Sequence, residues 1–109
     1  MAYDKELAHR IRELIGNHPA ITEKKMFGGI GFIIRGHLAC GVNGHDLIVR
    51  VGPDEHAAAL AHPHTRPFDV TGRAMKGWVM VSPQGCQSDA DLKNWVDQAL
   101  SFVLELPAK

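Results

Sequence analysis

The chain has 109 residues, of which 45% are hydrophobic and 22% charged, a composition typical of a single soluble globular domain with its own core. Twelve basic side chains balance twelve acidic ones, which argues against a protein that holds nucleic acid or an anionic membrane by bulk electrostatics. The sequence has no secretory signal, no apolar run near the roughly 20 residues of a membrane span, and only two cysteines. We therefore expect a cytoplasmic chain without a disulfide framework.

Residues 3–15 are expected to form the first helix. Asp4 is placed to cap its start and Gly16 to end it. Its apolar residues follow the helical repeat and would face a core: Leu7, Ile11, Leu14 and Ile15.

Three short strands follow, over residues 30–34, 38–42 and 47–51. The turn Asn43-Gly44 between the last two is a strong hairpin signal, because both residues tolerate positive φ. The two-residue repeat of a strand places one apolar set on a common face: Ile30, Phe32, Leu38, Cys40, Val42, Leu47, Val49 and Val51.

The second half of the chain repeats this alternation of helices and strands. A short helix is expected from Pro53 to about Ala61, strands over residues 68–70 and 77–81, and a long helix from Ser88 to about Glu105. The order α-β-β-β-α-β-β-α predicts an α+β fold, a two-layer sandwich of an antiparallel sheet with helices on one face.

The opposite face of this sheet is less polar than a solvated face usually is. It would carry Ile33, Ala39, Ile48, Trp78 and Met80. Two alternatives follow: the face or an edge strand pairs with a second copy in a homodimer, or loops or the segment 68–75 cover it.

Few residues suggest chemistry. The glycines of Gly28–Gly31 precede a strand rather than a helix, so they indicate close backbone packing and not a phosphate-binding loop. The cluster of His56, His62 and His64 lacks the thiolate partners of a structural zinc site. No nucleophile motif surrounds Cys86. We expect no catalytic residue, cofactor or metal; a ligand- or metal-binding module, or an enzyme using Cys86, remains the alternative.

The basic residues are dispersed over several turns, and no helix carries a basic face suited to the major groove. We therefore expect no tight autonomous DNA binding. The residues that could supply a weak patch are Lys24, Lys25, Arg35, Arg50, Arg73 and Lys76.

The stretch from Lys25 to Phe32, and a glycine-tryptophan strand before Pro83, resemble the N-terminal domain of the TfoX/Sxy regulators. The resemblance implies a two-layer α/β fold and a regulatory adaptor of competence genes, with a DNA-bound activator of the cyclic-AMP receptor class as its protein partner. We expect one such domain over residues 1–109. Its family-motif and interaction positions would be Lys25, Met26, Phe27, Gly28, Gly29, Gly31, Gly77 and Trp78.

Overall fold

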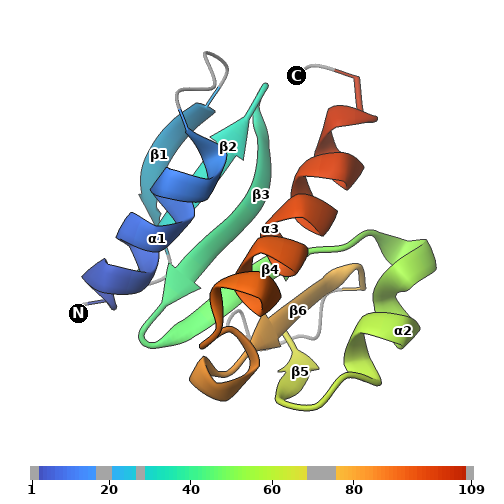
Figure 1. Ribbon diagram of the computed structural model, residues 1–109. Coiled ribbons are helices and arrows are strands. Elements are labelled where there is room, and N and C mark those ends of the chain that lie inside the picture. Colours follow the sequence, from blue (N-terminus) through green and yellow to red (C-terminus); the bar gives the residue numbers. More distant parts are fainter. Residues whose placement is uncertain (1–2, 17–20, 27–28, 69–75, 108–109) are drawn as a thin grey trace.

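A computed structural model of the chain describes residues 3–16, 21–26, 29–68 and 76–107. Six strands form one antiparallel sheet in the order β1-β2-β3-β4-β6-β5, and the helices lie against one face of it (Figure 1). The α+β fold and the expected order of elements are confirmed. Among the described residues, no helix has the length and apolar character needed to cross a membrane. The strands are β1 (Ile21–Met26), β2 (Gly29–Ile34), β3 (His37–Asn43), β4 (Asp46–Arg50), β5 (Thr65–Pro67) and β6 (Trp78–Val81). The helices are α1 (Lys5–Ile15), α2 (His56–Leu60) and α3 (Asp89–Leu104), with the short 3-10 helices η1 (Pro53–Glu55) and η2 (Pro83–Gly85).

The core lies between the sheet and the helices. Leu7 and Ile11 of α1 and the apolar stripe of α3 pack on alternate residues of the central strands. Trp95 is buried there as expected, whereas Leu100 is half-buried at its border. Burial of this apolar face explains why the two-residue repeat of the sequence predicted the three central strands β2, β3 and β4.

Strand β1 is an addition to the expected sheet. Residues 21–25 are mostly polar and lack the apolar alternation of a half-buried strand. The structure pairs β1 with β2 at the edge of the sheet, where polar side chains meet solvent. On the helix side, Glu23 of β1 receives two hydrogen bonds of 2.8 Å from the Arg12 guanidinium of α1.

A register shift in the β2–β3 hairpin corrects two predicted orientations. Phe32 pairs with Cys40, but the next residue, Ile33, pairs with Leu38, so Ala39 is an extra residue in β3. Ala39 is therefore buried in the core rather than on the opposite face. Leu38 was expected in the core but shares the face of Ile33 and is half-buried.

The fifth strand also lies elsewhere than predicted. It comprises Thr65–Pro67 instead of residues 68–70, and of the predicted positions only Phe68 belongs to the described residues. Proline in a short segment argues against a central strand, but β5 is an edge strand, where the missing amide donor costs no ladder hydrogen bond.

Phe68 instead covers part of the outer sheet face. Its side chain is 1% exposed and packs with Ile48 and Met80 and with the half-buried Trp78, whose ring centroid lies 5.9 Å from its own. For these residues the structure thus follows the second alternative, coverage by the segment that begins at Phe68.

Candidate functional site

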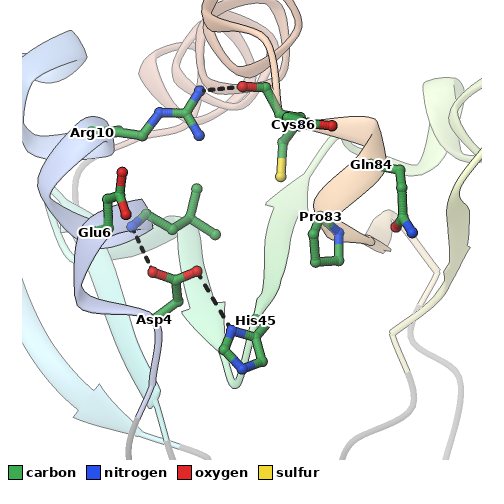
Figure 2. A pocket seen from close by; sticks show the side chains of 9 residues that line it. Asp4, Glu6, Arg10, His45, Pro83, Gln84 and Cys86 are labelled. Atoms are coloured by element: carbon green, nitrogen blue, oxygen red, sulfur yellow. Dashed lines mark hydrogen bonds and ion pairs between the residues drawn. The ribbon is translucent and has the colours of Figure 1, made fainter.

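Several ionisable side chains line a pocket between the start of α1, the β3–β4 turn and η2. Its volume is about 370 Å³, and Figure 2 shows carboxyl, guanidinium, imidazole and thiol groups around it. The groups that could take part in chemistry are Asp4, Glu6, Arg10, His45 and Cys86. We refer to this site as the α1–η2 pocket.

Asp4 is held by its structural role at the helix end. Its Oδ1 accepts a 3.0 Å hydrogen bond from the backbone N–H of Leu7, which caps α1 as the sequence predicted, and Oδ2 lies 3.5 Å from Nδ1 of His45. The Leu7 hydrogen bond, with a smaller contribution from His45, lowers the pKa of Asp4 below its ordinary value. A carboxylate so stabilised is a weak general base.

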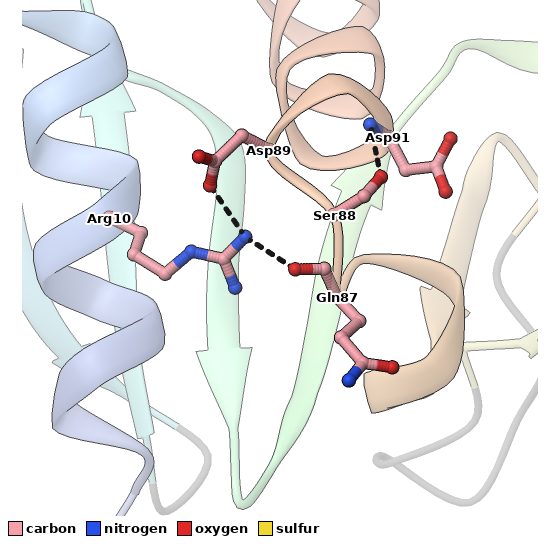
Figure 3. Close-up of polar contacts among 5 residues, drawn as sticks. All are labelled: Arg10, Gln87, Ser88, Asp89 and Asp91. Carbon is pink, nitrogen blue, oxygen red and sulfur yellow. Dashed lines mark hydrogen bonds and ion pairs between the residues drawn. The ribbon is translucent and has the colours of Figure 1, made fainter.

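Arg10 links α1 to the start of α3. Its Nη2 donates to the backbone oxygen of Gln87 at 2.9 Å and to Oδ1 of Asp89 at 3.1 Å (Figure 3). Beside it, the Ser88 hydroxyl accepts a 3.1 Å hydrogen bond from the Asp91 amide and caps α3. Through Nη2, the guanidinium therefore links α1 to the segment that begins α3.

Cys86 is buried, although the flanking residues 83–87 are mostly polar in sequence. Burial raises the pKa of its thiol to about 11, assisted by nearby carboxylates and only partly opposed by Arg10, and Sγ donates to the Ser82 carbonyl oxygen at 3.6 Å. Cys40 is fully buried, with its pKa raised to about 12. Both thiols are protonated at neutral pH and are poor nucleophiles.

The histidines of residues 56–64 are divided among different environments. Nδ1 of His56 accepts a 2.9 Å hydrogen bond from the Gly77 amide, and the His62 ring lies edge-on to Trp95 with centroids 5.2 Å apart. His64 is exposed and has a φ of 67°. Within the described ranges, no three His, Cys, Asp or Glu side chains are grouped so as to hold a metal ion.

The described family-motif positions near the first hairpin lie in strands β1 and β2. Lys25 is exposed on β1, and Met26 pairs with Gly29 on either side of Phe27 and Gly28, which lie outside the described residues. A Cβ atom on Gly29 would collide with the backbone oxygen of Val42, so only glycine fits there, as the structural interpretation predicted. Gly31 pairs with Gly41 and is buried.

The other two motif positions, Gly77 and Trp78, lie at the start of β6, nearer the opposite edge of the sheet. Gly77 has a φ of 92°, and its carbonyl oxygen accepts from the amides of Val51 and Gly52 at 2.8 and 3.1 Å. Trp78 opens β6, which β3 and β4 separate from β2. The structure does not bring the two groups of motif residues together.

Sequence reasoning missed the α1–η2 pocket as a whole. Two of its residues were singled out, Asp4 as a helix cap and Cys86 as the nucleophile of the alternative enzyme hypothesis. Arg10, His45 and Cys86 belong to three segments far apart in the chain, and no local motif signals that they lie near one another. Their proximity follows from the packing of α1 and η2 beside the β3–β4 turn.

Comparison with known proteins agrees with the motif residues. The profile of one family, the TfoX N-terminal domain, matches residues 13–103. The matched region begins within α1 and ends in the last turn of α3, so it includes the whole sheet. No curated protein and no solved structure gives a match.

Proposed function

Because the chain belongs to the TfoX N-terminal domain family, we propose that it is a non-enzymatic regulatory adaptor that acts through contacts with other proteins. The observation that carries the proposal is the state of the α1–η2 pocket. Within it the Asp4 carboxylate caps a helix, the Arg10 guanidinium joins two helices, and burial raises the pKa of the Cys86 thiol, so these three groups serve the structure and favour a non-enzymatic role.

The arrangement of the arginines supports a role that does not depend on autonomous DNA binding. The guanidinium of Arg50 stacks over both Trp78 and Phe102, with its Cζ 5.0 and 5.4 Å from the two ring centroids, and burial lowers its pKa. Phosphate groups are bound by free cations, so a guanidinium that is already engaged within the chain adds little to DNA affinity. Four further arginines donate to groups of the chain itself: Arg10 to Asp89, Arg12 to Glu23, Arg35 to the Leu104 carbonyl, and Arg66 to Asp46.

The family resemblance supplies the finer part of the proposal. The chain would modulate competence-type transcription from the cytoplasm by binding an activator of the cyclic-AMP receptor class that is already on its promoter. Sequence specificity would then come from the activator, and this chain would contribute protein–protein contacts.

Fluorescence anisotropy of a labelled duplex that contains the activator's site tests both parts. At near-physiological salt, we expect no change when the chain alone is added up to low micromolar concentration, and a further rise when it is added to the activator–duplex complex. A duplex with a scrambled site is the control. Submicromolar, sequence-dependent binding by the chain alone, or no effect on the activator complex, would overturn the proposal.

A further inference from the structure

One face of α3 is bordered by two neighbouring cavities. The first, of about 360 Å³, lies between α3 and the segment after α2, and the second, of about 510 Å³, lies between α3 and η1. Both are lined by Gln98, so they adjoin along the helix. Figure 1 shows α2 and its flanking segments on the side of α3 away from α1. We call the two cavities together the α2–α3 groove.

The α3 residues that line this groove form a single helical stripe. They are Asp91, Asn94, Trp95, Gln98, Ser101 and Phe102, at spacings of one, three or four residues, and Glu105, directly after α3, continues the stripe. From the first to the last, the stripe extends about 21 Å at about 1.5 Å per residue. An extended peptide rises about 3.3 Å per residue, so about seven residues would fill this length.

The rim of the groove is acidic, and its charges are accessible. Asp54, Glu55, Asp91 and Glu105 are all exposed, and their carboxylates have no hydrogen bond or ion pair with any residue in the described part of the chain. Elsewhere on α3 the carboxylates are engaged; Asp97, for example, lies 2.6 Å from Nζ of Lys93.

Among the residues that the structure describes, no lysine or arginine lines either cavity, and the basic side chains of the lining are the imidazoles of His62 and His64. The walls also offer aromatic surface. Phe102 is half-buried and already has the Arg50 guanidinium near its ring, with Cζ 5.4 Å from the centroid. Lysine and arginine side chains place their methylene stems on such apolar surface while their charged ends remain near carboxylates.

We propose that the α2–α3 groove binds a basic segment of a partner protein, about seven residues long and carrying several lysines or arginines. The groove supplies complementary charge along its rim and apolar walls for the side-chain stems. This proposal rests on the adaptor function and names the chemistry that its partner must present.

The test uses the whole chain and a fluorescein-labelled peptide of about seven residues in which lysine alternates with alanine, a length set by the rise of an extended chain. A peptide with glutamine in place of lysine is the matched probe. In ¹⁵N–¹H spectra of the labelled chain, we expect the lysine peptide to shift amides at Glu55, Gln98 and Ser101, and the glutamine peptide to shift none of them.

Two variants locate the charge requirement. In the triple variant Asp54→Asn, Glu55→Gln, Glu105→Gln, anisotropy should show about tenfold weaker binding, because each exposed ion pair contributes about a twofold to fivefold factor. Asp97→Asn removes a charge from α3 outside the groove and should change affinity by less than about twofold. Circular dichroism checks that both variants remain folded.

Amide shifts elsewhere, undiminished binding by the triple variant, or no binding of the lysine peptide at millimolar concentration would each overturn the groove proposal. The activator assay separates its failure from failure of the adaptor function. If the triple variant still joins the activator complex as the unmodified chain does, the adaptor function stands and the groove proposal falls. If the lysine peptide binds the groove but the chain does not join the complex, the adaptor function falls.

Discussion

Truncation of Phe68 to alanine tests whether this side chain shields the outer face of the sheet. The ring is 1% exposed, and its removal would uncover Ile48 and Met80, which are 3% and 2% exposed in its presence. The variant would therefore lose the buried apolar area of the ring and would also expose Ile48 of β4 and Met80 of β6 to water.

The magnitude follows from the burial. Replacing a fully buried phenylalanine by alanine costs about 3–5 kcal/mol, and a ring at the periphery of the fold should lie near the lower value, about 3 kcal/mol. A domain of this size has about 5–15 kcal/mol of stability, so the variant should still fold. Its melting temperature should fall by about 10–20 °C.

Urea unfolding measured by fluorescence gives the free-energy change, and light scattering at high micromolar concentration gives the mass. We expect the unmodified chain to be monomeric and Phe68→Ala to self-associate through the uncovered strands. Phe32→Ala is the matched control: Phe32 is 0% exposed on the helix face, so that variant should lose comparable stability and remain monomeric.

A Phe68→Ala variant of unchanged stability and mass would refute the covering role. A dimeric unmodified chain would instead favour the first alternative for this face, pairing with a second copy.

Three further predictions concern single side chains. In a Cys40→Ala variant, iodoacetamide should alkylate Cys86 about a hundredfold more slowly than an ordinary thiol at neutral pH, because its pKa of about 11 leaves little thiolate; fast alkylation measured by mass spectrometry would restore the enzyme alternative. Gly77→Ala should lower the free energy of unfolding by about 2 kcal/mol, since φ is 92° and the new Cβ would lie 3.1 Å from the Gly52 carbonyl carbon; an unchanged urea midpoint would contradict this. Asp4→Ala should cost about 1 kcal/mol at neutral pH. The folded-state pKa of Asp4 is lowered, so its contribution is complete above the ordinary aspartate pKa of about 3.9 and is lost as pH falls through the folded value; a stability difference that persists at lower pH would exclude this linkage.

The sequence by itself determined the elements whose burial is periodic. Leu47, Val49 and Val51 alternate with Ile48 and Arg50, and the structure buries the first set under the helices as this alternation predicts. The cap Asp4 was equally visible, because a helix end is satisfied by residues within one turn of it.

The features that depend on strand pairing, namely register and position in the sheet, are visible only in the tertiary structure. One extra residue in β3 reversed the faces of Leu38 and Ala39, and no local pattern marks such a bulge. Strands β1 and β5 lie at the two edges of the sheet, which explains why polar residues and a proline are tolerated there. Whether a strand lies at an edge depends on which other strands pair with it, so the strand's own sequence does not determine this.

The pockets depend on tertiary structure for the same reason. Asp4, His45 and Cys86 meet in the α1–η2 pocket, and Asp54 and Glu105 border the α2–α3 groove, although many residues separate them in the chain. The sequence shows which of these side chains carry charge or a thiol. Only packing determines which charges find partners, which thiols are shielded from water, and which carboxylates remain free at the surface, because each outcome depends on neighbours contributed by distant segments.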